Sequence, residues 1–404
     1  MFLLRGARLP PPAGSEFSPV LFARRLVLVL MLAVLSLAPA RANPMLLVDM
    51  DNFDVLYAQD AGQPWHPASL TKMMTAFVTF EQIALGKVSL DTPVIVSKKA
   101  VALAPSKSGL PVGSAVSLQD ALYLMLVKSA NDIALSIAET VGGDEAGFIA
   151  LMNNAASRMG LTATHYVNPH GLHDIGQVTS ARDMAVLSLY IRQSFPQYMP
   201  IFGTDTVVLN GKKLESENKL LGKFAGTTGM KTGFVCASGL NMVATVQRNG
   251  RNMMAVIMGA SSARERNERA AELVLKGLSG GATPTGQSVL ALTNKVGTPP
   301  VDMRALICGK DAATYTAAQQ AAFPMGLKDQ PSYLTDTIAS SPYVATDLGR
   351  IAVGINLPRP RPYHAPVFTL PTTEASLGTD LRPGLPAAVV SANPFPRPRP
   401  DFYR

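Results

Sequence analysis

A serine and a lysine stand three residues apart at the start of an apolar stretch. Ser69 and Lys72 precede apolar residues that recur at helical spacing to about Leu85, and Pro67 is typical of a helix start. A serine hydroxyl becomes nucleophilic when a base removes its proton, and a lysine among apolar groups can lose its charge and act as that base. The spacing indicates a nucleophile and its base on one helix face, with free backbone N–H groups nearby for an oxyanion. Ser-x-x-Lys also occurs by chance on solvated helices, so this interpretation needs partners.

Two more short motifs supply candidate partners. In Ser129-x-Asn131, the hydroxyl could relay a proton to a leaving amine and the amide could hold a substrate carbonyl. In Lys231-Thr232-Gly233, the lysine offers positive charge, the threonine offers a hydroxyl to a carboxylate, and the glycine lets a substrate approach the backbone. Each motif is weak alone, whereas the three in this order predict one site.

Apolar periodicity and turn residues predict the elements that carry these motifs. Strands are expected at residues 45–50 and 54–58 as a hairpin, and again at 204–209, 231–235, 240–247 and 252–259. Helices are expected from residue 69 to about 85 and at 118–127, where Ser117 and Asp120 form a capping pair. After the turn at 128–132, a second helix is expected to continue to about residue 141, and further helices are expected at 148–159, 181–193 and 263–278. Strands at both ends with helices between predict an α+β fold with one antiparallel sheet covered by helices.

The three motifs and their surroundings resemble the low-molecular-mass penicillin-binding proteins, the serine-type D-Ala-D-Ala carboxypeptidases. The similarity runs from about Met45 to Leu278 and includes the segments at 67–75, 125–132, 168–172 and 229–233. It implies a β-lactamase/transpeptidase-like α/β fold without cofactor or metal. It also implies an acyl-enzyme, in which Ser69 attacks the penultimate D-Ala of a peptidoglycan stem peptide and Lys72 takes its proton. β-Lactam antibiotics would then be covalent inhibitors.

The resemblance also implies a substrate-binding set. An oxyanion hole would come from the backbone N–H groups of Ser69 and Phe234, and a terminal carboxylate would lie near Thr232 and an arginine. We assign that arginine to Arg266, with Arg264 as the rival. Family members often carry Tyr or His after Lys-Thr-Gly and then a hydroxyl residue, whereas here Phe234 and Val235 follow. This departure removes a side-chain hydroxyl that would help to bind the carboxylate.

Four other functions compete with this interpretation. A class A β-lactamase deacylates through a glutamate, but no glutamate occurs between Glu145 and Glu215. A D,D-endopeptidase would use the same residues on a cross-link, and a non-catalytic wall-binding protein would not need both Ser69 and Lys72. A metal site could draw on His165, His170, His173 and Asp174, although Asn-Pro-His-Gly is better suited to a turn.

The two ends of the 404-residue chain differ from its middle. Arg24-Arg25, an apolar run to Ala38 and a small-x-small site at Ala42 predict a secretory signal at residues 1–42; an uncleaved anchor and a twin-arginine signal are the alternatives. We therefore expect an exported, periplasmic protein, loosely associated with the inner membrane or free. The formal charge of +8 is concentrated in that leader, and nothing suggests nucleic acid or a stable protein partner.

Residues 43–279 are expected to form the catalytic domain, and residues 280–404 a largely irregular extension with little core. Pro-Arg-Pro-Arg-Pro occurs at 358–362 and 396–400, while residues 306–325 are expected to hold one or two short helices. The two cysteines, Cys236 and Cys308, would form a disulfide that holds the extension to the domain, or remain buried free thiols.

Overall fold

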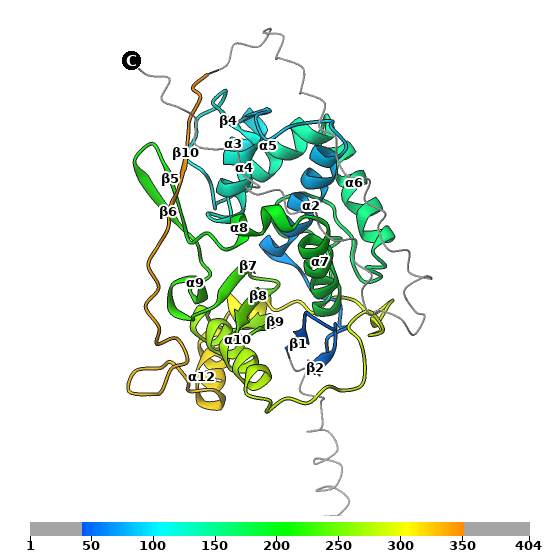
Figure 1. Cartoon of the computed structure of the whole chain (residues 1–404), viewed down its shortest axis with the longest axis vertical. Coiled ribbons are helices and arrows are strands. Elements are labelled where there is room, and N and C mark those ends of the chain that lie inside the picture. Colours follow the sequence, from blue (N-terminus) through cyan, green and yellow to red (C-terminus); the bar gives the residue numbers. More distant parts are fainter. Residues whose placement is uncertain (1–42, 351–404) are drawn as a thin grey trace, which may run out of the picture. The chain divides into compact units, whose positions relative to one another are not determined.

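A five-stranded antiparallel sheet is built from both ends of the catalytic region, as predicted (Figure 1). The computed structural model describes residues 43–350. The strands lie in the order β2-β1-β9-β8-β7 and comprise β1 (Met45–Asp49), β2 (Val55–Gln59), β7 (Thr227–Val235), β8 (Gly239–Arg248) and β9 (Arg251–Ala260). Asn249 and Gly250, with φ values of 54° and 74°, form the turn between β8 and β9. The Lys-Thr-Gly strand β7 is therefore an edge strand, open to a substrate along one side.

Helices cover the sheet. Most of them lie in the sequence between β2 and β7, the strands from the two ends of the catalytic region. They are η1 (Ala68–Leu70), α2 (Thr71–Ala84), α3 (Lys98–Ala102), α4 (Leu118–Leu126), α5 (Asn131–Gly142), α6 (Glu145–Arg158), α7 (Ala181–Ser194), η2 (Pro196–Tyr198), α8 (Met199–Phe202), α9 (Leu220–Lys223) and α10 (Ala263–Leu278). The predicted cap is confirmed, because the Ser117 side chain accepts a hydrogen bond from the Asp120 backbone N–H. Asp144, Ser180 and Ser262 cap α6, α7 and α10 in the same way.

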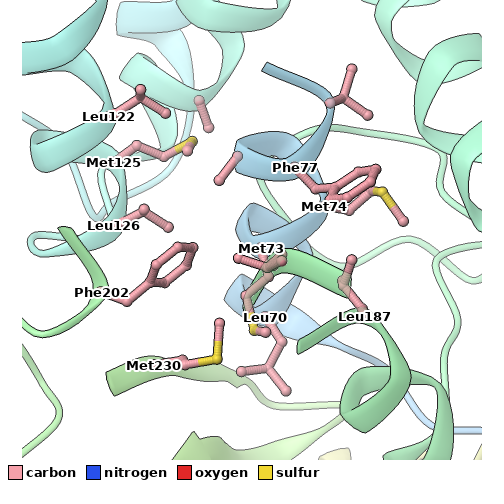
Figure 2. Packing of buried hydrophobic residues seen from close by; sticks show 14 of the residues in the cluster. Leu70, Met73, Met74, Phe77, Leu122, Met125, Leu126, Leu187, Phe202 and Met230 are labelled. Carbon is pink, nitrogen blue, oxygen red and sulfur yellow. The ribbon is translucent and has the colours of Figure 1, made fainter. Parts of the chain in front are cut away.

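The central helix α2 is buried around most of its circumference. Figure 2 shows its apolar side chains between those of the surrounding elements; the labelled residues are Leu70, Met73, Met74, Phe77, Leu122, Met125, Leu126, Leu187, Phe202 and Met230. The opposite face of the sheet packs against α10 through a second apolar cluster, which includes Met253 and Val274. Because α2 lies inside the core, its one lysine, Lys72, is taken out of water.

Two small sheets were not predicted in full. β3 (Pro93–Ile95) pairs with β4 (Ala115–Ser117), and β5 (Thr206–Leu209) pairs with β6 (Lys212–Glu215) on one side and with β10 (Tyr343–Ala345) on the other. Strands of three or four residues are too short to show a clear alternation of apolar and polar side chains. The pairing of β10 with β5 is parallel and joins segments more than 130 residues apart, which no local pattern reveals.

The extension follows the surface of the catalytic domain through its described part, residues 280–350 (Figure 1). The short helices expected at residues 306–325 are confirmed as α11 (Arg304–Ile307) and α12 (Ala312–Ala322), and most of the remaining segment is irregular, as expected. The structure pairs Cys236 with Cys308 in a disulfide. The leader at 1–42 and both Pro-Arg runs lie outside the described residues. Within residues 43–350, we find no helix that is both long and apolar enough to cross a membrane.

Candidate active site

Ser69 lies in the short turn η1, two residues before α2 begins, and not within the α-helix itself. Ala68 has a φ of 49°, a left-handed conformation that is uncommon for a residue other than glycine. Lys72 is in the first turn of α2, and its Nζ lies 3.0 Å from Ser69 Oγ. The structure therefore places the hydroxyl and the amine next to each other, as the Ser-x-x-Lys spacing predicts.

Two oxygen atoms fix the direction of the Lys72 amine. Nζ donates hydrogen bonds to Asn131 Oδ1 at 2.7 Å and to the His170 carbonyl oxygen at 2.6 Å. A neutral amine has two hydrogens and one lone pair, and both of these oxygens can only accept. Since they take both hydrogens, the lone pair is directed at the Ser69 hydroxyl. This is the geometry that a general base requires.

Two buried lysines control the charge of the site. Burial lowers the pKa of Lys72 well below its ordinary value; the positive charge of Lys231 lowers it further, and the carboxylate of Asp132 raises it. Burial likewise lowers the pKa of Lys231 to about 7, with a further lowering from Arg266 and a raising effect from Glu217. These shifts favour the neutral Lys72 amine, which can accept a proton, and they place the pKa of Lys231 at about 7.

The Ser-x-Asn turn between α4 and α5 brings the second motif to the other two. Ser129 has a φ of 62°, and its Oγ accepts a hydrogen bond of 2.9 Å from Lys231 Nζ. Asn131 contributes Oδ1 to Lys72, while its Nδ2 donates to the carbonyl oxygen of Ala104 at 3.0 Å. The side chains of Ser69, Lys72 and Asn131 thus form one hydrogen-bonded group and those of Ser129 and Lys231 a second, and the Ser129–Asn131 turn joins the two groups.

The glycine of the third motif allows β7 to lie against the serine turn. A Cβ atom built on Gly233 would lie 2.9 Å from the Ser69 backbone nitrogen and 3.0 Å from the Pro67 carbonyl oxygen. These distances are too short for a side chain, so only glycine permits this approach. The next residue, Phe234, is 50% exposed and directs its ring away from the core. Its backbone N–H and that of Ser69 lie on facing segments, as an oxyanion hole requires.

The two candidate arginines have different environments. Arg266 is buried, 3% exposed, and its charge acts on Lys231, while its own pKa is lowered by burial to about 10. Arg266 donates to the Glu217 carbonyl oxygen at 2.8 Å, whereas Arg264 donates to the carbonyl oxygens of Phe323 and Met325 in the extension and lies over the Phe323 ring. The structure thus favours Arg266 as the arginine near the Lys-Thr-Gly strand, and it gives Arg264 a structural partner.

The turn at Asn168–Leu172 contributes a residue that the sequence analysis did not place in the site. Its contribution is the His170 carbonyl oxygen, a backbone atom that residue types do not reveal. Gly171 has a φ of 84°, and a Cβ there would lie 1.9 Å from the Ala68 carbonyl oxygen. The useful signal was Asn-x-x-Gly, because Asn168 Oδ1 accepts from the Gly171 N–H and closes the turn.

A second unpredicted set supports Asn131 from behind. The Asp132 carboxylate is 1% exposed and accepts hydrogen bonds from the Ser108 backbone N–H and hydroxyl at 3.0 Å and 2.6 Å. The same loop supplies the Ser106 carbonyl oxygen, which accepts from the Asn131 N–H at 2.7 Å. Asp132 therefore fixes the loop at residues 106–108, and this loop in turn fixes the backbone of Asn131.

Two of the histidines considered for a metal site, His170 and His173, make other contacts, the second of them with His66. His66 Nδ1 lies 2.9 Å from the Gln177 carbonyl oxygen and its ring packs edge-on against His173, while His170 Nδ1 accepts from the Leu172 N–H. Across residues 43–350, the structure contains no group of three His, Cys, Asp or Glu side chains arranged to hold a metal ion.

Comparison with known proteins agrees with this geometry. A family profile described as D-alanyl-D-alanine carboxypeptidase matches residues 34–262. The D-alanyl-D-alanine carboxypeptidase DacD of Salmonella typhimurium is 31% identical over 318 residues, which cover 75% of this chain and 81% of that protein. With several other carboxypeptidases of this kind, the match spans only 61% or 62% of the relative's length.

Solved structures agree in fold. Penicillin-binding protein 6B from Escherichia coli is 33% identical, with a TM-score of 0.56 over 59% of this chain and 77% of that one. Penicillin-binding protein D2 from Listeria monocytogenes, solved in a cefotaxime-bound form, is 29% identical, with a TM-score of 0.52 over 59% of this chain and 97% of that one. The resemblance inferred from the motifs is confirmed: this chain belongs to the D-alanyl-D-alanine carboxypeptidase family of serine peptidases and has the penicillin-binding protein fold.

Proposed function

We propose that this protein removes the terminal D-alanine from peptidoglycan pentapeptides through an acyl-enzyme on Ser69. The observation that carries the proposal is the Lys72 amine, which is buried, has both hydrogens engaged by oxygen atoms, and lies 3.0 Å from the Ser69 hydroxyl. The two other oxygen atoms already accept both hydrogens of the neutral Lys72 amine, so the contact with Ser69 is not needed to satisfy its hydrogen bonds. The arrangement instead favours transfer of the Ser69 proton.

Acylation follows from these positions. Ser69 Oγ attacks the penultimate D-Ala carbonyl carbon as its proton passes to Lys72, and the resulting oxyanion lies between the Ser69 and Phe234 N–H groups. The C–N bond then breaks, and the departing D-alanine amine receives a proton through Ser129, which Lys231 holds in place at 2.9 Å. Water subsequently attacks the ester, and the Ser69 hydroxyl is restored.

Selection of a free carboxyl terminus rests on positive charge. Lys231, the Thr232 hydroxyl and Arg266 provide two cationic side chains and one donor on the same side of the site, each less than 10% exposed. Removal from water strengthens their attraction for a carboxylate. A D-Ala-D-Ala terminus presents such a carboxylate next to the scissile bond, so this grouping supports the proposed carboxypeptidase, while the breadth of the groove distinguishes it from an endopeptidase.

Covalent inhibition by β-lactams follows from the same chemistry. A β-lactam presents a strained amide carbonyl and a carboxylate to the same groups, and a related penicillin-binding protein has been solved with cefotaxime bound. Since the chain has no glutamate between Glu145 and Glu215 to activate water, we expect the penicilloyl-enzyme to be long-lived. The reaction itself requires no cofactor.

Two assays test the proposal. Fluorescent penicillin should label the wild type and fail to label Ser69→Ala, whose circular dichroism should be unchanged. D-Alanine release from a pentapeptide is then compared with cleavage of a cross-linked dimer. Cleavage of the dimer alone would establish the endopeptidase function instead, and equal labelling of Ser69→Ala would remove Ser69 as the nucleophile.

We also propose that the protein is exported to the periplasm and that cleavage follows Ala42. The basic, apolar and small-residue segments of the leader support this proposal. Mass spectrometry of the protein recovered from a cell-envelope fraction should give an N-terminus at Asn43. Recovery of the full-length chain from membranes would instead support an uncleaved anchor.

A further inference from the structure

The direction of a bound substrate along β7 can be extrapolated from the proposed function, on which this inference rests. The terminal carboxylate lies near Thr232 and the scissile carbonyl near Phe234. An extended peptide advances about 3.3 Å per residue, like the strand beside it. The residues that precede the scissile bond therefore run onward past Phe234, toward Cys236 and the turn that leads into β8.

The extension lies against the turn at this end of β7. The disulfide joins Cys236, two residues after Phe234, to Cys308 at the end of α11. Next to it, the Met303 N–H donates a hydrogen bond of 3.0 Å to the Ala237 carbonyl oxygen, and the Met303 side chain is buried. One covalent bond and one backbone hydrogen bond thus fix residues 301–308 beside the path of the substrate.

This segment presents one negative and one positive side chain. Arg304 Nε donates to both carboxylate oxygens of Asp302 at 3.0 Å and 2.8 Å, and the side chain of Arg304 is 59% exposed and that of Asp302 42%. Met303 lies between them and is hydrogen-bonded to Ala237, so the pair flanks the contact with the turn that follows β7. Exposed ion pairs stabilise a fold little, so these two groups are free to exchange partners with a ligand.

We propose that residues 301–308 form the outer wall of the substrate groove, and that Asp302 and Arg304 recognise a stem-peptide side chain ending in both an ammonium and a carboxylate. The carboxylate of Asp302 accepts from the ammonium, and the guanidinium of Arg304 donates to the carboxylate. A neutral or singly charged side chain at that position satisfies only part of the pair. The extension thereby determines which stem peptides are trimmed efficiently.

Two substrates that differ in length test the wall. One is a stem pentapeptide with a zwitterionic third residue, and the other is N-acetyl-D-Ala-D-Ala, which ends before the wall. Asp302→Asn and Arg304→Gln should each lower kcat/KM for the pentapeptide about fivefold and leave the short substrate within about twofold. The matched control is Asp60→Asn with Lys295→Gln, an ion pair of similar exposure between the end of β2 and the extension, and it should affect neither substrate.

The outcomes separate this inference from the proposed function. If Asp302→Asn and Arg304→Gln lower kcat/KM equally for both substrates, or for neither, the proposal that residues 301–308 contact the substrate is wrong. If the wild type releases D-alanine from neither substrate, the proposed function itself is wrong, independently of the role of residues 301–308.

The disulfide provides a second test. In Cys308→Ser, we expect the same selective loss for the pentapeptide, and a reductant should produce that loss in the wild type without a further effect in Cys308→Ser. An unchanged ratio of the two kcat/KM values after complete reduction would contradict the proposal. If Cys308→Ser does not fold, the surface variants Asp302→Asn and Arg304→Gln decide the question alone.

Discussion

The catalytic network and the extension are stabilised in different ways. Lys72 and Lys231 are 0% and 2% exposed, and burial both fixes their positions and lowers their pKa values. In the extension, by contrast, α11 and α12 bury no residue, and the segment is held by the disulfide, backbone and side-chain hydrogen bonds, ring contacts and a few buried side chains such as Met303. Small changes in the network should therefore alter chemistry, whereas equal changes in the extension should mainly alter stability or substrate preference.

The largest effect is expected from a backbone position beneath the serine. Gly171→Ala would place a Cβ 1.9 Å from the Ala68 carbonyl oxygen at a φ of 84°, so the Ser69 turn must shift. We expect the rate of penicillin acylation to fall more than about 100-fold, because displacements near 1 Å have this effect on positioned groups. Gly176→Ala is the control, since its Cβ would meet only side-chain atoms at 3.2 Å and 3.4 Å. Equal rates for the two variants would contradict the structure.

Removal of Lys231 should change the pH profile as well as the rate. kcat/KM should rise with pH as Lys72 loses its proton and fall above about pH 7 as Lys231 loses its charge. Lys231→Met should lower kcat/KM about 100-fold or more and abolish the alkaline fall. Because the charge that lowers the pKa of Lys72 is gone, the acid limb should move to higher pH. An alkaline limb that persists in this variant would assign it to another group.

Asp132→Asn should act through the Ser108 loop, and it should shift the pKa of Lys72 in the direction opposite to that expected for Lys231→Met. The loss of the carboxylate weakens the support of Asn131, and we expect kcat to fall about tenfold with KM little changed. Since the carboxylate raises the pKa of Lys72, its removal should move the acid limb of kcat/KM to lower pH. Ser108→Ala is the matched variant, because it removes a hydrogen bond without a charge and should leave the acid limb in place. A shift in the same direction as that of Lys231→Met would be inconsistent with this account.

The arginines should differ by substrate terminus. Arg266→Ala should weaken kcat/KM about tenfold for a substrate that ends in a free carboxylate, and much less for the corresponding C-terminal amide. Arg264→Ala should reduce thermal stability through its lost contacts with Phe323 and Met325. It should leave unchanged the ratio of kcat/KM for the free-carboxylate substrate to kcat/KM for the amide. A larger change in the ratio from Arg264→Ala would reverse our assignment.

The smallest effect is expected in the last part of the extension. Tyr343 stacks on Tyr123 with ring centroids 3.5 Å apart, and its hydroxyl donates to Asp120 Oδ1 at 2.6 Å. Tyr343→Phe keeps the stack and loses the hydrogen bond, which should lower the free energy of unfolding by about 1 kcal/mol. Calorimetry measures this change. Penicillin acylation should stay within about twofold, and a greater loss would show that the extension also controls the nucleophile.

Local patterns predicted most of the sheet and the long helices. Residues 263–278 agree with α10 at both ends, because a serine cap and an apolar stripe define that helix in the sequence. The three motifs predicted the convergence of Ser69, Lys72, Ser129, Asn131 and Lys231, since each motif needs particular side chains. Their order along the chain then matched a known family.

Backbone atoms and long-range pairings were beyond the reach of such patterns. The His170 carbonyl oxygen acts on Lys72 although the identity of the side chain is irrelevant to that contact. β10 has only three residues and is defined by its partner β5 rather than by its own sequence. The choice between paired and free cysteines likewise depended on the path of the extension, which its irregular sequence did not reveal.

The path of the extension determines how much of the chain a shortened enzyme must keep. A truncation at Leu278 would remove Tyr343 and the Thr346 N–H, both of which donate to Asp120 in the first turn of α4. It would also take away the Gly349 carbonyl oxygen, which accepts from the N–H of Ala115 in β4. A shortened enzyme for inhibitor screening or crystallisation should therefore retain residues 343–349, which make these contacts well past the last residue matched by the family profile.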